Sequence, residues 1–399
     1  MSAGGRRLRG AAGPVLALLL YAAVMAWLLR LPCGWAGSAQ RWPGLCAGDA
    51  APPGGSLLGA GPAGEAPPLV RAVSAVLGRL AANVSALLGT APDPAAVEHL
   101  PRVLLLLAWA ATVVAVHRVT GSRADALVLA VAPAVLVAGF RTWDLWAVLF
   151  MVSALLLHAR GRAVAAGVLV GLGASVSLFP AAVLLAVLFL AARHRRLREA
   201  GLVLLGAVLT WALVNGPSVL ASWERWTTGA AALADRPVGE SSFWGVWARL
   251  DRAVTGSAPE GTGVHVLLPL VLGLMAVLVL TVLARQEPGA AQVVFLVLAL
   301  VVLLGTDHSM VQVLWLVPLV VLAGRPRWEF TAWQLVELAH WAVLVLPPGA
   351  WPGPPWTGPG AQELLGALRV LFLGWLLVAV AVDVLRGARV VRPVSAGPR

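Results

Sequence analysis

The chain has 399 residues, of which 60% are hydrophobic and only 12% are charged, and its formal net charge is +11. All 29 basic residues are arginine and lie between apolar runs rather than on one continuous face, which argues against a nucleic-acid-binding protein. The repeated apolar runs match the thickness of the bilayer core, so the composition predicts an all-α polytopic membrane protein without an appended soluble catalytic domain.

The apolar runs predict about twelve transmembrane helices in a single membrane domain over residues 1–399, with eleven helices as the alternative. The count depends on the stretch 163–193, which is too long for one span and is interrupted by Pro180. We interpret it as two short helices hinged at the sequence SLFP. The expected spans are 13–31, 101–117, 124–140, 143–158, the two halves of 163–193, 200–216, 264–283, 290–304, 310–323, 331–347 and 362–385.

The arginines predict the side of the membrane that each loop faces. If the N-terminus is cytoplasmic, 18 of the 29 arginines fall in cytoplasmic loops. This bias follows the positive-inside rule and predicts a multi-pass protein of the cell membrane with both termini in the cytoplasm, including a basic tail at 386–399. The two large loops, 32–100 and 217–263, are then extracytoplasmic, and most acidic residues lie on their side.

The first large loop carries Cys33 and Cys46, the only two cysteines of the chain. We predict a disulfide between them because an extracytoplasmic compartment is oxidising, and two free thiols are the alternative. An unstrained disulfide across this loop would contribute about 3 kcal/mol and would hold Asp49 near the end of the first span. That span also resembles the start of a signal peptide, with weak cleavage positions at Ala36 and Ala39, but we expect it to be retained.

Residues 68–88, later in the same loop, place a row of apolar side chains on one helical face. This pattern predicts an amphipathic helix that lies on the outer surface of the bilayer. The alternative is an additional spanning helix, which would invert every later loop and contradict the arginine bias.

Three further patterns favour structural roles. Glu337 and His340 lie one turn apart in the middle of a predicted span, where we expect a mutually satisfied pair that faces the bundle interior. The glycine-rich segment GVLVGLG at 167–173 lies inside a span, so close helix packing explains it better than phosphate binding. The seven histidines are scattered and no HExxH motif occurs, so we predict no cofactor and leave a divalent metal open.

Five motifs occur in the order found in a known family. They are PC…CAGD with Cys33, Cys46 and Asp49, EAPPL from Glu65, SVSLFP at 175–180, RPVGESSFWGVW at 236–247, and TDHSMVQVLWLVPLVVLAGRPRW at 306–328. In these motifs the chain resembles the bacterial polyprenol-phosphate-sugar-dependent glycosyltransferases of the GT-C fold, specifically the actinobacterial mannosyltransferases of family 87. It departs from the family pattern at Ala66, Ser177 and Asp307.

This resemblance implies a GT-C-like helical bundle that transfers a sugar, mannose by analogy, from a polyprenyl phosphate to a glycolipid or glycan of the cell envelope. Asp49 matches the position of the catalytic base, which takes a proton from the acceptor hydroxyl while the anomeric carbon is attacked with inversion. Arg236, with Arg141 in reserve, is the candidate to stabilise the phosphate leaving group. The remaining candidates for substrate binding are Asp307 with His308, Glu65 and Glu240.

Two other functions remain as alternatives. The departures at polar motif positions fit a catalytically degenerate relative that binds a polyprenyl lipid or a partner glycosyltransferase. A lipid or solute transporter would require polar residues along the spans and an internal repeat. The expected partners in all these cases are membrane lipids rather than nucleic acid.

Overall fold

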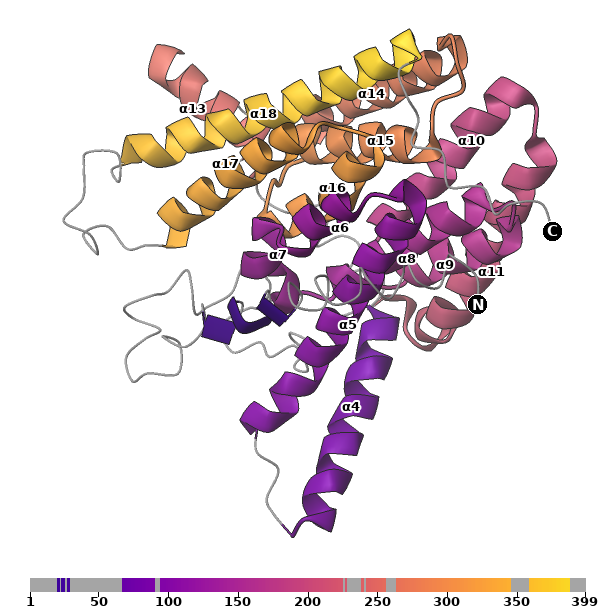
Figure 1. Ribbon diagram of the computed structural model, residues 1–399, viewed down its shortest axis with the longest axis vertical. Coiled ribbons are helices and arrows are strands. Elements are labelled where there is room, and N and C mark those ends of the chain that lie inside the picture. The colour runs from indigo at the N-terminus through magenta and orange to yellow at the C-terminus, as the bar shows by residue number, and fades with distance from the viewer. Residues whose placement is uncertain are drawn as a thin grey trace.

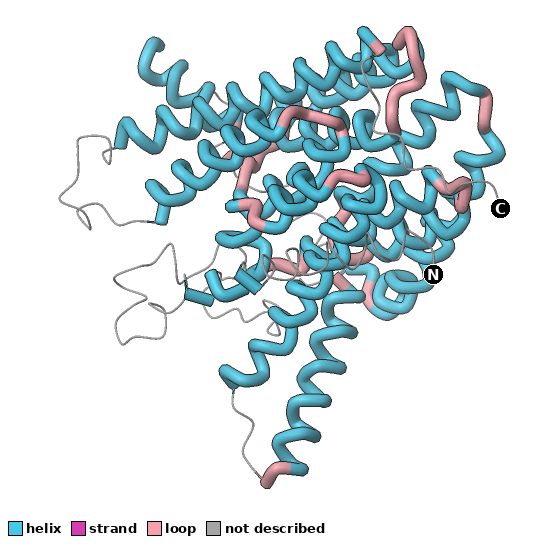
Figure 2. The backbone as a smooth tube through the Cα atoms, in the orientation of Figure 1, coloured by secondary structure: helices cyan, strands magenta, loops and turns pink. Residues whose placement is uncertain are grey.

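The computed structural model describes residues 67–89, 94–224, 238–239, 242–255, 263–345 and 359–387, together with Thr227 and parts of 20–28. Within these residues every regular element is a helix and no strand occurs (Figure 2), which confirms the all-α prediction for this part of the chain. The helices are α4 (Pro68–Leu87), α5 (Pro94–Thr120), α6 (Arg123–Ala130), α7 (Pro133–Ala138), η2 (Gly139–Arg141), α8 (Asp144–Ala159), α9 (Ala163–Ala174), η3 (Phe179–Ala181), α10 (Ala182–His194), α11 (Leu197–Ala221), α13 (Phe243–Thr255), α14 (Gly263–Leu283), α15 (Ala290–Leu304), α16 (Met310–Leu322), α17 (Arg327–Val345) and α18 (Pro359–Arg386).

Several of the described helices have the length and composition of membrane spans. Six qualify fully, and five shorter helices are also apolar. The six are Pro68–Leu87, Leu100–Thr120, Arg123–Arg141, Leu197–Ala221, Val266–Leu283 and Ala361–Arg386, and the five are Asp144–Ala159, Ala163–Ala174, Phe179–His194, Ala290–Leu304 and Met310–Leu322. The chain is therefore a multi-pass membrane protein.

Prolines divide two of the expected spans. The stretch 163–193 forms α9 and α10 with the short η3 around Pro180 between them, as the sequence predicts. The expected span 124–140 is instead interrupted between α6 and α7, because Pro133 can begin a helix but cannot continue one. The backbone N–H of Ala134 is left without a partner inside the helix, and it donates to Oε1 of Gln334 on α17 at 3.0 Å.

The glycine-rich segment packs α9 directly against α11. A Cβ atom added to Gly167 would lie 2.2 Å from the carbonyl oxygen of Val203, and one added to Gly171 would lie 2.5 Å from that of Ala207. From the other helix, a Cβ on Gly206 would lie 2.6 Å from the carbonyl oxygen of Val164. The two backbones can approach this closely only because these positions have no side chain, which confirms the packing interpretation of GVLVGLG.

Helix α15 is the central helix of the C-terminal half. Its residues from Gln292 to Leu300 are all buried, and it packs against α10, α14, α16 and α18. By contrast, α11, α14 and α18 expose large apolar side chains such as Leu213, Leu267 and Leu371. A helix that is apolar all round belongs in a core, and helices with exposed apolar faces are expected where lipid replaces water as the solvent.

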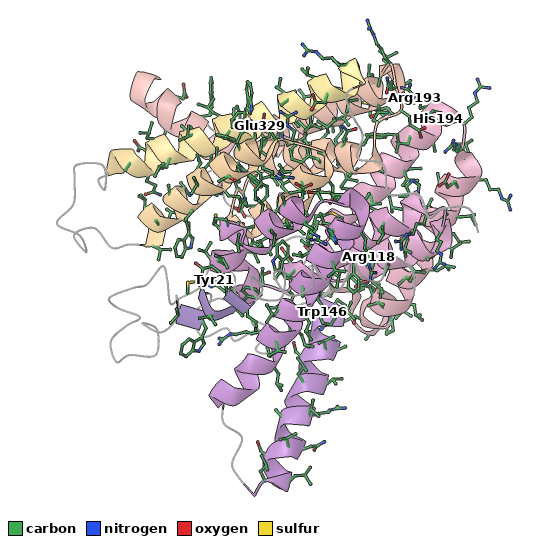
Figure 3. All side chains as sticks on the ribbon, in the orientation of Figure 1. Tyr21, Arg118, Trp146, Arg193, His194 and Glu329 are labelled. Atoms are coloured by element: carbon green, nitrogen blue, oxygen red, sulfur yellow. The ribbon has the colours of Figure 1, made fainter. Side chains whose placement is uncertain are left out.

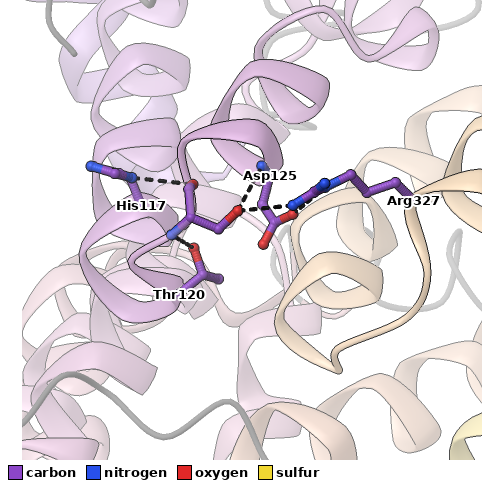
Figure 4. A network of polar contacts seen from close by, with 5 residues as sticks. His117, Thr120, Asp125 and Arg327 are labelled. Atoms are coloured by element: carbon purple, nitrogen blue, oxygen red, sulfur yellow. Dashed lines mark hydrogen bonds and ion pairs between the residues drawn. The ribbon is translucent and has the colours of Figure 1, made fainter. Parts of the chain in front are cut away.

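Many of the arginine-bearing loops meet at one end of the bundle, which we call the arginine end. Arg327 donates to Asp125 at 2.7 Å and to Ser122 at 3.2 Å, within the polar network of Figure 4. Arg325 pairs with Glu329 and Asp383. Near the end of α10 (Figure 3), Arg193 donates to the carbonyl oxygens of Thr281 and Val282 at the end of α14, and His194 lies 3.4 Å from Glu287. This convergence agrees with the predicted alternation of the loops.

Helix α4 and the beginning of α5 project from the rest of the bundle, and α4 runs across the direction of α14 and α18 (Figure 1). Arg71 of α4 donates to Ser218 of α11 at 3.1 Å, so α4 is attached to the bundle near its own first turn. Further along α4, Val76, Leu80 and Leu87 are exposed. The helix predicted at 68–88 is thus present, and it carries an exposed apolar face.

Candidate functional site

Several of the predicted site residues lie outside the described residues. The disulfide, the candidate base and three of the substrate-binding candidates therefore stay predictions. These residues are Cys33, Cys46, Asp49, Glu65, Arg236 and Glu240.

The remaining candidates lie at the end of the bundle away from the arginine end, which we call the opposite end. Arg141 closes η2 in the turn between α7 and α8, where it is half-buried. Three residues later, Oδ2 of Asp144 accepts a hydrogen bond from the indole N–H of Trp315 at 2.8 Å. The Trp315 ring stacks on Phe179, with ring centroids 4.5 Å apart. A single tryptophan of α16 therefore fixes the start of α8 and the hinge that follows α9.

Asp307 lies in the short connection between α15 and α16, and a segment of the second large loop docks beside it. The N–H of Gly239 donates to the carbonyl oxygen of Thr306 at 2.7 Å, and the indole N–H of Trp244 in α13 donates to that of Leu304 at 2.7 Å. These bonds satisfy carbonyl groups at and just beyond the C-terminal end of α15, which lack partners within the helix. The second large loop is thereby joined to the connection that carries two of the predicted site residues.

His308 points into the bundle and joins a buried polar cluster, which we define as His308, Trp333, Glu337, His340 and Arg369. The Nε atom of Arg369 donates to Oε2 of Glu337 at 2.6 Å, and its Nη1 atom donates to Nδ1 of His340 at 3.1 Å. The indole N–H of Trp333 donates to Oε1 of Glu337 at 3.1 Å, and Nε2 of His308 lies 3.7 Å from that oxygen. Each of these charged or imidazole side chains is no more than 2% exposed.

Arg369 changes the interpretation of Glu337 and His340. The sequence predicted that they would satisfy each other, whereas Arg369 of α18 bonds to both of them. Sequence reasoning missed this residue, although an arginine in the middle of the predicted span 362–385 carries the same signal that identified Glu337. The ion pair makes the cluster neutral overall, because the guanidinium charge offsets that of the carboxylate.

The protonation of His308 follows from its surroundings. His308 belongs to the connection between α15 and α16, and its burial lowers the pKa of the imidazole well below the ordinary value. Arg369 and then His340 lower this pKa further. A neutral imidazole has one N–H donor and one nitrogen acceptor, so His308 can exchange hydrogen bonds with an uncharged polar group.

The cluster is not arranged as a metal site. Among the described residues, no group of three or more histidine, cysteine, aspartate or glutamate side chains could hold a metal ion. Within the part of the chain that the structure describes, the opposite end offers the hydrogen-bonding groups of Arg369 and His308, the carboxylate of Asp307 between α15 and α16, and the guanidinium of Arg141 before α8.

The chain matches a known protein family. Residues 67–306 match the sequence model of glycosyltransferase family 87, which covers more than half of the chain. The matched segment begins just before α4 and ends at Thr306, directly before Asp307 and His308. No curated protein matches the chain.

Proposed function

The chain belongs to glycosyltransferase family 87, and we propose that it transfers a sugar from a polyprenyl-phosphate donor to a glycolipid or glycan of the cell envelope. The family match is the observation that carries this proposal. It supports a membrane-bound transferase, and the helical bundle supports access to a lipid-linked donor from within the bilayer. The sugar that we propose is mannose.

The proposed reaction takes place on the outer face of the cell membrane, with both termini in the cytoplasm. The acceptor hydroxyl attacks the anomeric carbon, its proton passes to the carboxylate of Asp49, and the bond from that carbon to the phosphate oxygen breaks with inversion. The leaving group is the polyprenyl phosphate, which already carries negative charge, so it requires charge stabilisation rather than a general acid. Arg236 and Arg141 are the proposed sources of that stabilisation, and Glu65, Glu240 and Asp307 are proposed contacts of the sugar or the acceptor.

A transporter is less consistent with the buried polar cluster. Three of its ionisable groups, Glu337, His340 and Arg369, already bond to one another, whereas a transport path requires polar groups that are free to bind and release the transported molecule. A degenerate relative would bind the lipid but would not transfer a sugar from it, so a transfer assay distinguishes the two functions.

The proposal is tested by transfer from a labelled polyprenyl-phosphate mannose in membranes that contain the protein. We expect Asp49→Asn to reduce transfer by at least a factor of about 100, because loss of a positioned base costs on the order of 10²–10⁴ in rate. Asp93→Asn, which changes another aspartate of the same predicted loop, is the matched control and should retain transfer. Unchanged transfer by the Asp49→Asn protein would refute the mechanism, and no transfer by the wild-type protein with this donor would refute the donor.

A further inference from the structure

Two side chains of the buried polar cluster have polar atoms without a hydrogen-bond partner. These atoms are Nη2 of Arg369 and both ring nitrogens of His308, which form no hydrogen bond with any residue that the structure describes. Arg369 is 1% exposed and His308 is 2% exposed, so water at the surface does not satisfy these atoms. A buried polar group without a partner is unfavourable, so these atoms mark a place where a bound group would complete the hydrogen bonding.

The two side chains that carry the unpartnered atoms meet at one residue. Both side chains contact the same carboxylate, Arg369 at Oε2 of Glu337 and His308 beside Oε1. The other donors of the arginine and tryptophan side chains are already used. The indole N–H of Trp333 and Nε of Arg369 bond to Glu337, and Nη1 of Arg369 bonds to His340. What remains is one cationic N–H donor next to a neutral ring that can both donate and accept.

The charge of the cluster selects the class of ligand. Glu337 neutralises Arg369, and a phosphate bound to Nη2 would lie only a few ångströms from that carboxylate, so like-charge repulsion opposes an anion. A hydroxyl group meets no such repulsion. Its oxygen can accept from Nη2 of Arg369 while its proton is donated to the free nitrogen of His308. Sugars present hydroxyl groups of this kind.

We propose that Arg369 and His308 form a sugar-binding subsite that holds a hydroxyl group of the transferred or the acceptor sugar. This inference rests on the proposed function and assigns the role of substrate recognition to two residues beyond the matched family segment. The second large loop lies next to the two residues. Gly239 and Trp244 attach it at the carbonyl groups just before His308, and Val246 lies 3.8 Å from the Cβ position of Gly366 on α18.

The test uses the full-length protein in lipid nanodiscs, which avoid sugar-based detergents, with methyl α-mannoside as the probe and saturation-transfer NMR as the measurement. His308→Ala leaves the Arg369–Glu337 ion pair intact, and Glu337→Gln/Arg369→Gln removes both charges together. We expect each variant to weaken mannoside binding by at least ten-fold. The matched control, Asp125→Asn/Arg327→Gln, removes an ion pair at the arginine end and should bind as the wild type does.

The outcomes separate this inference from the proposed function. Equal binding by wild type and both cluster variants, or no binding by the folded wild type, would overturn the sugar subsite and leave a buried water as the occupant. Displacement of the mannoside by inorganic phosphate from the wild type, and not from the cluster variants, is a further outcome. That result would overturn the sugar subsite in favour of an anion site. The Asp49→Asn protein should still bind the mannoside without transferring sugar, so a chain that binds but never transfers contradicts the proposed function alone. Unchanged KM values for donor and acceptor in an active His308→Ala protein would contradict the subsite alone.

Discussion

Trp315 shows how one side chain organises the opposite end of the bundle. Its indole N–H donates to Asp144 at the start of α8, and its ring stacks on Phe179 in η3. The carboxylate of Asp144 also lies in the first turn of α8, where a negative charge is favoured by the partial positive charge of the helix N-terminus. The turn that carries Arg141 is therefore held by a hydrogen bond and a helix dipole together.

We predict that Asp144→Ala lowers the thermal stability of the protein more than Asp144→Asn does. The alanine variant leaves the partly buried indole N–H of Trp315 without its acceptor, which costs about 1–3 kcal/mol, whereas an asparagine carbonyl oxygen can still accept from it. Melting temperatures in nanodiscs measure the difference. Equal melting temperatures for the two variants would show that the hydrogen bond does not stabilise this turn.

The buried polar cluster also shows what the sequence could predict at the level of single residues. Ionisable residues in the middle of apolar runs are expensive, and this rule identified Glu337 and His340 correctly as buried groups. The same rule applies to Arg369, so its burial was predictable. Its partners were not, because the register between α17 and α18 depends on how the helices pack, and periodicity within each helix does not contain that information.

At the scale of elements, helix boundaries followed from proline and from apolar length. Pro180 predicted the hinge between α9 and α10, and the structure confirms it. Pro133 produced a break that was not predicted, because the span around it has the length of one helix. Gln334 supplies the hydrogen bond that the break requires, and it comes from α17, about 200 positions away along the chain. A compensation of this kind is visible only after folding.

The contact between α9 and α11 leads to a prediction on their glycines. Gly171→Ala would place its Cβ atom 2.5 Å from the carbonyl oxygen of Ala207, so the helices must separate. We expect a destabilisation of at least about 1–3 kcal/mol, as for other over-packed cores. Gly201→Ala on α11 is the matched control, because nothing lies within 4 Å of its Cβ position and alanine is the better helix former.

Thermal melting and the yield of folded protein measure this prediction. The Gly171→Ala protein should melt at a lower temperature than the wild type, and the Gly201→Ala protein should melt at the same or a higher temperature. If both variants melt as the wild type does, α9 and α11 do not pack at the distance described here.

At the scale of the whole molecule, the arginine bias and the three-dimensional arrangement agree. Loops that are far apart in the sequence, such as those with Asp125, Arg193 and Arg325, belong to the same end of the bundle. The sequence could predict this because the alternation of spans places every second loop on the same side. The place of α4 was harder to predict, since its length and composition permit both a span and a surface helix. Figure 1 shows α4 beside α5, projecting from the bundle, so its placement on the bilayer surface stays a prediction.

The orientation of the bundle gives the last prediction. If the arginine end faces the cytoplasm, the loop with Cys33 and Cys46 faces outward, and mild reduction of intact cells should make both cysteines reactive to a membrane-impermeant maleimide. In a Cys33→Ser/Cys46→Ser background, Arg198→Cys places a single thiol at an exposed position of the arginine end. It should react only after the cells are permeabilised. The opposite pattern of labelling would reverse the membrane orientation, and Asp49 would then face the cytoplasm, on the side away from the proposed site of transfer.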